Sequence, residues 1–359
     1  MNAIYFQTCW KHISGTCYRE NTNKEHKSFV KINMMEQKLR LIAEELKIPH
    51  TNLGLLRGKM GKALFFYHYT RHIDCRYKMY ADKCLDEIIE NIQKVNGNYA
   101  DGLAGVGTGI EYLVQEGFID GDTNEILRDF DRIISHIVSS FPGSIDMRTG
   151  ITGYGKYYLA RLNNPGDNKN PDFDTEFIEA QLSKIVDLLS LDYATYQDLF
   201  FVISFLPNII SLNINKEKAV IYFNYAVDLL ETMVYEDTHF EKYPGAFNPL
   251  VAAILLFRSS TKIGNLDLAD RASYFLEKYE FGFRPYLSEE YAVKWTYLYH
   301  ILWKTCNRDI YQVLSTQWLE KTSDNKLNLE SGNLIITGMM LLSMNKSIND
   351  DWLDWFPLF

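Results

Sequence analysis

A glycine-rich stretch that runs into an apolar helix is the feature that most constrains this chain. Residues 101–113 read Asp-Gly-Leu-Ala-Gly-Val-Gly-Thr-Gly-Ile-Glu-Tyr-Leu, with four glycines in eight positions. Each glycine costs about 1 kcal/mol relative to alanine inside a helix, yet apolar residues continue at helical spacing through Ile110 and Leu113. Such a start is tolerated where the backbone approaches a neighbour closely, or where the preceding turn needs a positive φ.

The pattern returns along the chain at a nearly constant interval. Apolar helices are predicted to start about 44 to 50 residues apart over six units, and a seventh start follows: Gly58, Gly102, Gly150, Leu199, Pro249, Leu298 and Gly332. An amphipathic helix lies between successive starts. A helix that is apolar on all sides is buried, and a one-sided helix covers it. Seven such pairs predict an all-α chain, either an open α-solenoid or a closed double ring of helices.

Composition narrows the class of protein. The net charge of −9 argues against a nucleic-acid groove, which needs concentrated positive charge. Five cysteines without metal-knuckle spacing indicate a reducing compartment, and no apolar run reaches the roughly 18 residues of a membrane helix. We therefore expect a cytoplasmic protein without a membrane span. Residues 1–33 lack periodicity and are expected to form a poorly patterned N-terminal extension, while residues 34–359 form one domain.

The glycine motifs resemble those of the lanthionine synthetase C-like proteins, the cyclases of lantibiotic biosynthesis. The resemblance rests on residues 102–113, on residues 150–162 and on the seven helices with glycine-type starts. It implies an α/α toroid of seven inner and seven outer helices, with the inner helix starts around one mouth of the barrel. It also implies a precursor peptide or a peptide-modifying enzyme as partner.

In that family the last three inner starts carry the chemistry. Zinc is held by the Cys of a Trp-Cys-Tyr-Gly turn and by the Cys and His of a Cys-His-Gly turn, and a further His precedes a Gly in the fifth unit. The metal lowers the pKa of a substrate cysteine, whose thiolate adds to a dehydroamino acid to form a thioether ring. The resemblance places Asn248, Thr296 and Glu330-Ser331 at these positions.

The replacements remove every soft ligand. Threonine, glutamate and serine offer oxygen donors, which suit Mg²⁺ or Ca²⁺ better than zinc. We therefore expect no zinc cofactor, and a pseudoenzyme that binds a peptide or serves as an accessory protein. Tyr297 and Asn248 occupy family-equivalent positions where any residual catalysis is expected. His300 and Glu330 are a possible acid/base pair, although His300 is expected more simply to be a core histidine.

Four residues near the predicted helix starts are candidates for binding a peptide. Three are aromatic and one carries a positive charge that suits acidic groups: Trp295, Phe247, Tyr154 and Arg148. Each has a plain structural alternative, since aromatic rings also fill a barrel and an arginine also decorates a solvated rim.

Two further functions stay open. A carbohydrate-active α/α-barrel hydrolase needs paired carboxylates about 5 to 9 Å apart, for which Asp101, Asp146, Asp198 and Glu330 are the candidates. An active cyclase with an unconventional site would depend on Tyr297 or Glu330.

Overall fold

The computed structural model describes residues 21–140, 143–162, 175–236, 247–278, 292–321 and 331–346. These residues form α-helices joined by turns and two short 3-10 helices, and no strand occurs among them. The predicted all-α class is therefore confirmed.

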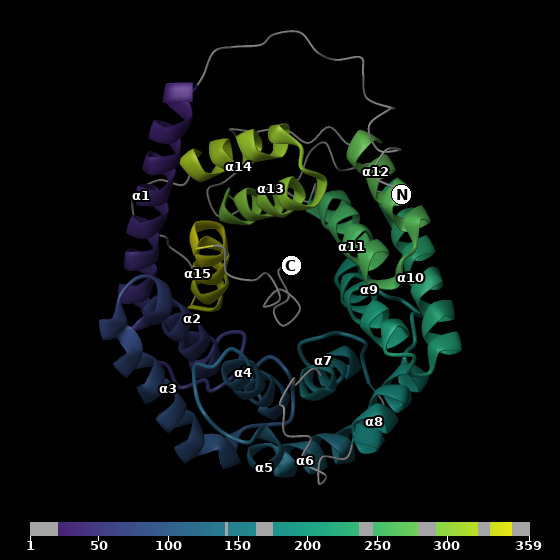
Figure 1. Ribbon diagram of the computed structural model, residues 1–359. Helices are drawn as coiled ribbons and strands as arrows, with labels where there is room; N and C mark the ends of the chain where they lie inside the picture. Colours follow the sequence, from purple (N-terminus) through teal and green to yellow (C-terminus); the bar gives the residue numbers. More distant parts are fainter. Residues whose placement is uncertain are drawn as a thin grey trace.

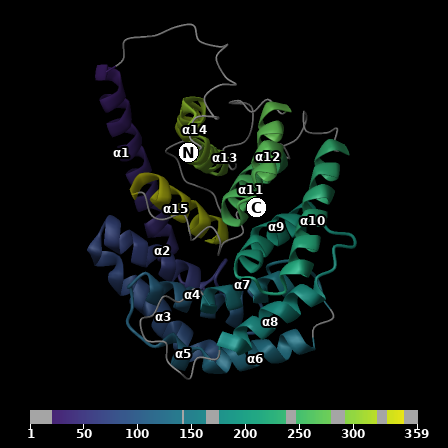
Figure 2. The ribbon, with the colours of Figure 1, turned by 45° about the vertical axis from the view of Figure 1, so that its right-hand side comes forward.

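Two concentric rings of helices make up the molecule (Figures 1 and 2). The inner ring consists of seven helices: α2 (Lys59–His72), α4 (Leu103–Gln115), α7 (Ile151–Leu162), α9 (Tyr196–Ser211), α11 (Phe247–Ile263), α13 (Ala292–Cys306) and α15 (Ser331–Lys346). The outer ring consists of α1 (Asn21–Leu46), α3 (Lys78–Asn91), the short α5 (Thr123–Ile126) with α6 (Arg128–Ser139), α8 (Thr175–Leu188), α10 (Lys216–Glu236), α12 (Leu266–Lys278) and α14 (Asp309–Lys321).

Each inner helix packs on its two inner neighbours and on an outer helix, and the ring is closed by the two ends of the described chain. Helix α15 contacts both α2 and α1, so the last inner helix lies beside the first helices of the chain. The closed double ring predicted by the resemblance is therefore the observed architecture, and the open solenoid is not. None of the described helices has the length and apolarity that crossing a bilayer requires.

Burial follows the division into rings. Residues 103–113 of α4 are buried except for Ile110, as are Met60 through Tyr69 of α2. By contrast, α3 buries only Ala81 and Ile88. A helix that is covered on every side must be apolar on every side, which is why the inner helices lack a polar stripe.

The predicted helix starts are correct where glycine marks them and wrong where it does not. Gly58 and Gly102 are the N-caps of α2 and α4, and α7 begins directly after Gly150. The helix expected at Leu199 begins at Tyr196, because Thr195 caps it. The helix expected at Leu298 begins at Ala292, so that leucine lies in mid-helix.

The N-terminal boundary also needs correction. Periodicity predicts a first helix from Met34 and an unpatterned segment before it, but α1 begins at Asn21. The first helix therefore starts within the segment expected to be an extension, and the division into an extension at 1–33 and one domain at 34–359 stays a prediction.

Candidate functional site

Three loops that precede inner helices share one geometry. Each begins with a short polar residue six positions before the first glycine: Asn52, Asn96 and Ser144. Its side-chain oxygen accepts a hydrogen bond from the backbone N–H two residues later, at 2.7, 3.1 and 3.1 Å. Its backbone carbonyl accepts the first N–H of the helix, at 2.9, 2.8 and 2.9 Å. The loops therefore satisfy the helix starts from within.

The second glycine of each motif lies against its own loop. A Cβ on Gly61, Gly105 or Gly153 would collide with the backbone carbonyl oxygen six residues earlier in each case. Glycine is required here because backbone approaches backbone, which is the first of the two explanations that the sequence offers. The first glycines have extended backbone, with φ of −120° at Gly58 and −126° at Gly102, so a positive φ is not the reason.

Backbone hydrogen bonds tie the three loops into one rim. The N–H of Leu56 donates to the carbonyl of Ala100 at 3.0 Å. The N–H groups of Tyr99 and Ala100 both donate to the carbonyl of Arg148, at 3.1 and 2.9 Å. Because Leu56, Ala100 and Arg148 hold the same place in their loops, two residues before the glycine, three helix starts are fixed relative to one another.

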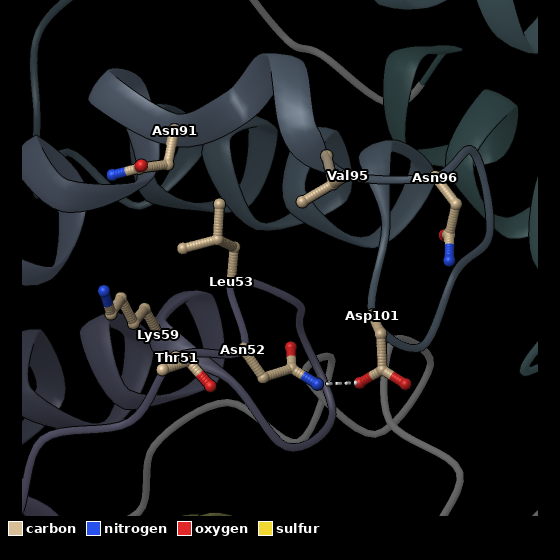
Figure 3. A pocket seen from close by; sticks show the side chains of 8 residues that line it. All are labelled: Thr51, Asn52, Leu53, Lys59, Asn91, Val95, Asn96 and Asp101. Carbon is tan, nitrogen blue, oxygen red and sulfur yellow. Dashed lines mark hydrogen bonds between the residues drawn. The ribbon is translucent and has the colours of Figure 1, made fainter.

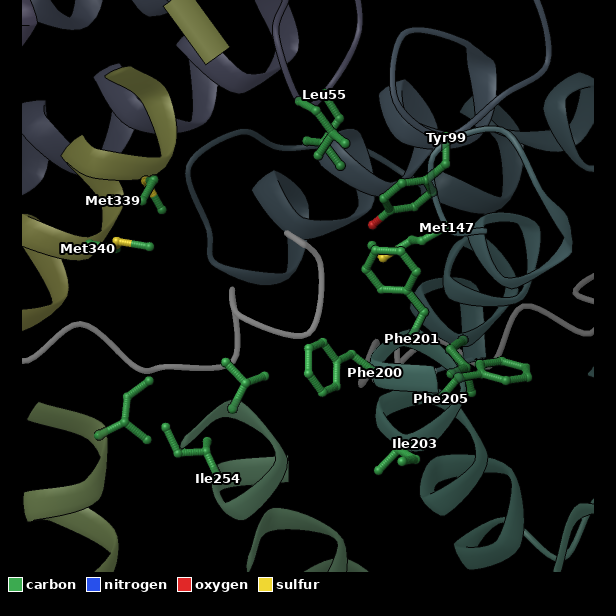
Figure 4. Packing of buried hydrophobic residues seen from close by; sticks show 14 of the residues in the cluster. Leu55, Tyr99, Met147, Phe200, Phe201, Ile203, Phe205, Ile254, Met339 and Met340 are labelled. Atoms are coloured by element: carbon green, nitrogen blue, oxygen red, sulfur yellow. The ribbon is translucent and has the colours of Figure 1, made fainter. Parts of the chain in front are cut away.

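The rim has an apolar inner side and a polar outer side. Leu55, Tyr99 and Met147 are buried and face the same interior as Phe200 and Phe201 of α9 (Figure 4). The neighbouring residues Arg57 and Arg148 are exposed. The predicted binding residue Arg148 therefore lies at the rim with an accessible guanidinium.

A polar pocket opens between the first two loops and the end of α3 (Figure 3). Its volume is about 460 Å³, and its lining combines four polar uncharged residues, two charged residues and two apolar residues: Thr51, Asn52, Asn91, Asn96, Lys59, Asp101, Leu53 and Val95. The Asn52 amide donates to Asp101 at 2.7 Å across the two loops. The sequence prediction missed this pocket, although the recurring asparagine six residues before the glycine was visible.

The sixth unit places its residues differently from the prediction. Thr296 is fully buried, and its hydroxyl donates to the carbonyl of Ala292 at 2.7 Å in the first turns of α13. Trp295 stacks on Trp318 of α14 with ring centroids 5.6 Å apart, so its indole belongs to the packing between the rings. Tyr297 is also fully buried. These residues were expected at a helix start, and α13 begins too early for that.

The other predicted positions divide between buried residues and residues that the structure does not describe. Tyr154 is 4% exposed, and burial together with the Asp146 carboxylate raises the pKa of its phenol. His300 is buried beside Tyr297 and Trp303, in keeping with a core histidine. Helices α11 and α15 begin at Phe247 and Ser331, but the side chains of Phe247, Asn248 and Ser331, and all of Glu330, lie outside the described residues.

The carboxylates proposed for a hydrolase each bind their own loop or its neighbour. Asp146 accepts from the N–H groups of Arg148 and Thr149 and from the Thr149 hydroxyl. Asp198 accepts from Thr195 in a capping box at the start of α9. Asp101 accepts from the Asn52 amide. All three have structural roles at helix starts, which is where a carboxylate complements the helix dipole.

Glu111 of α4 lies in a buried ion network. The Arg161 guanidinium of α7 contacts Glu111 of α4 at 2.8 Å and Asp131 of α6 at 3.1 Å. Arg161 and Glu111 are each about 1% exposed at the side chain. Burial raises the pKa of Glu111, although the nearby Arg161 charge acts in the opposite direction. For Arg161 burial lowers the pKa, but the neighbouring carboxylates outweigh it and the pKa is raised. The network holds three helices together away from the rim.

Comparison with known proteins finds a family model that matches the part of the chain with the three rim loops. Residues 49–203 match the family model described as lanthionine synthetase C-like protein. This part of the chain is similar to the lanthionine synthetase C-like family. The match spans the three loops with the glycine pattern and ends within α9, so the inner helices α11, α13 and α15 lie beyond it.

The solved structure of a nisin cyclase shares the lanthionine synthetase C-like fold. It aligns with a TM-score of 0.58 and 17% sequence identity, over 92% of this chain and 98% of that chain. At this identity the likeness shows the α/α toroid and no more. No sequence among the curated proteins matches the chain.

Among the positions that the resemblance assigns to the zinc site, only Thr296 has a described side chain. Thr296 gives its hydroxyl to its own helix and is buried. Cys84 lies on the outer helix α3, where burial raises its thiol pKa to about 11, and Cys306 ends α13 far from its start. Within the described parts of the chain, no group of three or more His, Cys, Asp or Glu residues is placed to hold a metal ion. The toroid fold is therefore shown, and the expected lack of a zinc cofactor stays a prediction.

Proposed function

We propose that this chain binds a peptide at the rim of the toroid and does not carry out zinc-dependent thioether formation. The observation that carries the proposal is the contrast between two regions of one ring. The three loops joined through Ala100 and Arg148 lie within the part that matches the family model, while the hydroxyl of Thr296 bonds within its own helix. The hydrogen-bonded rim supports the binding of a peptide, and the threonine at the sixth unit, which is not a soft ligand, supports the lack of zinc-dependent thiolate chemistry.

The rim offers suitable groups for a peptide. Arg57 and Arg148 are exposed, and a guanidinium forms bidentate hydrogen bonds with carboxylates. A precursor-type peptide is supported by the family match over residues 49–203 and by the likeness in fold to a nisin cyclase. The cytoplasm is proposed as the location, supported by five cysteines without a disulfide framework.

The carbohydrate-hydrolase alternative is less well supported. Asp101, Asp146 and Asp198 already accept hydrogen bonds within the loops and caps that they stabilise. A catalytic pair needs one carboxyl group free to donate a proton and a second free to attack or activate water. An unconventional cyclase at Tyr297 also lacks support, because that ring is fully buried.

The test uses full-length protein and a synthetic acidic peptide with one cysteine and one dehydroalanine. Binding is measured by fluorescence anisotropy, and ring closure by loss of the free thiol, since cyclisation leaves the peptide mass unchanged. We expect saturable binding that persists in chelator and no enzyme-dependent thiol loss. We also expect binding about three- to ten-fold weaker in Arg148→Ala, which corresponds to the roughly 0.7 to 1.4 kcal/mol of one hydrogen bond at an exposed site. Enzyme-dependent thiol consumption, or no binding at millimolar peptide, would overturn the proposal.

A further inference from the structure

The pocket beside α2 and α4 lies next to the rim and contains hydrogen-bonding groups that the fold does not use. The Asn96 side-chain oxygen accepts from the N–H of Asn98, and its amide nitrogen has no partner among the described residues. The same holds for the hydroxyl of Thr51, which is exposed at the pocket edge. Comparison of the repeats explains why the Asn96 amide has no partner there. Asn52 donates to Asp101 of the next loop, but the residue that Asn96 would meet in its own next loop is Thr149, whose hydroxyl donates to Asp146.

The pocket also offers an acceptor and an apolar floor. One oxygen of Asp101 accepts from Asn52, which leaves its second oxygen for a ligand. Leu53 and Val95 supply the apolar part of the lining, one from the loop before α2 and the other from the segment after α3 (Figure 3). Donors and an acceptor around a small apolar surface match a peptide segment, whose backbone alternates N–H and C=O groups around each side chain.

The charges disfavour a phosphate group in the same place. Lys59 is engaged by Glu87 at 2.6 Å, so its positive charge is already paired. The first N–H groups of α2, from Lys59, Met60 and Gly61, donate to carbonyls of the preceding loop and are not available to an anion. Asp101 adds negative charge at the edge. A dianion would therefore meet a carboxylate and no free helix terminus.

We infer that this pocket is a peptide-binding subsite, in which the Asn96 amide and the Asp101 carboxylate pair with the backbone of an extended segment and an apolar side chain lies between Leu53 and Val95. The inference rests on the proposed function and deepens it, because it assigns one part of the peptide to a place outside the central barrel. A volume of about 460 Å³ is sufficient for a segment of two or three residues.

The experiment uses the full chain with methyl-labelled leucine and valine, so that Leu53 and Val95 report directly on the pocket. The probe is acetyl-Gly-Leu-Gly-amide, which has no charged termini. We expect saturable shifts of the two methyl signals, and affinity lower by about three- to ten-fold in both Asn96→Asp and Thr51→Val. Asn96→Asp keeps the oxygen that accepts from Asn98 and so preserves the loop. Thr232→Val, on an exposed turn of α10, is the matched control.

The outcomes separate the subsite from the proposed function. Shifts that also appear at the same concentration with acetyl-Gly-Ser-Gly-amide would contradict the apolar floor. No shift of either methyl group, or equal affinity in Asn96→Asp and the control, would overturn the subsite. If the longer acidic peptide still binds the protein and loses affinity in Arg148→Ala but not in Asn96→Asp, the proposed function stands and the subsite does not.

Discussion

Gly105 gives the sharpest test of the close approach that builds the rim. A methyl group at this position would collide with the carbonyl of Tyr99 and would lie 2.9 Å from the Cβ of Leu55. The carbonyl belongs to the loop whose N–H groups, from Tyr99 and Ala100, donate to Arg148. Since neither obstacle is the far end of a flexible side chain, Gly105→Ala must displace the loop.

The magnitude follows from three contributions. Overpacking of a buried site costs about 1 to 3 kcal/mol. Weakening the two loop hydrogen bonds costs about 1 kcal/mol each, while alanine returns about 1 kcal/mol of helix propensity. We expect the free energy of unfolding to fall by roughly 2 to 4 kcal/mol.

The assay is urea unfolding followed by circular dichroism, with Gly109→Ala as the matched control in the same helix. At Gly109 the added methyl group meets only the side chain of Met60, which is flexible and can move aside. The control should therefore lose at most about 1 kcal/mol. If Gly105→Ala is as stable as the wild type, or if the two variants lose the same free energy, the close approach does not determine the structure of the rim.

Two predictions concern buried charge. Arg161→Met leaves the Glu111 and Asp131 carboxylates without their buried cation and should lower the free energy of unfolding by about 3 to 5 kcal/mol. Arg271→Met breaks partly exposed ion pairs between α12 and α10 and should cost less than about 1 kcal/mol. Equal losses in thermal unfolding would contradict the buried network. His68 is buried, and burial first, then His72 and Arg71, lowers its pKa to about 3. In the unfolded chain His68 binds a proton below about pH 6.5, whereas in the folded chain it stays neutral down to about pH 3. The contribution of His68 to the free energy of unfolding is therefore fully present above about pH 6.5, and it falls by roughly 1.4 kcal/mol per pH unit toward pH 3. His68→Gln should flatten this part of the stability profile, and an unchanged slope would show that His68 is protonated in the fold.

The sequence predicted the ring well because glycine and apolar periodicity act locally. At Gly58, Gly102 and Gly150 the same backbone contact forces the same residue, so the start of each helix is visible in the chain. Where other residues close the turn, as Thr195 does for α9, an apolar run alone does not reveal the first residue of the helix. The error at α13 has this origin: the helix was predicted to begin at Leu298, so Thr296 was expected in the turn before it and not inside the helix.

The polar groups of the interior were harder to predict. Arg161 lies in an apolar helix, and its partners Glu111 and Asp131 are 50 and 30 residues away in the chain. No local pattern links such residues, because their pairing follows from how α4, α6 and α7 pack. The pocket was missed for a related reason. It needs two loops from different units, and only their relative position turns Asn52 and Asn96 into a lining.

The zinc content of the full-length protein tests the central claim most directly. Protein is purified without chelator, incubated with a small excess of zinc, desalted and measured by elemental analysis against protein concentration. A lanthionine synthetase C-like toroid whose sixth unit has Thr296 turned into its helix should retain far less than one zinc ion per chain. One tightly held zinc ion per chain would contradict the account and would instead support zinc-dependent cyclase activity.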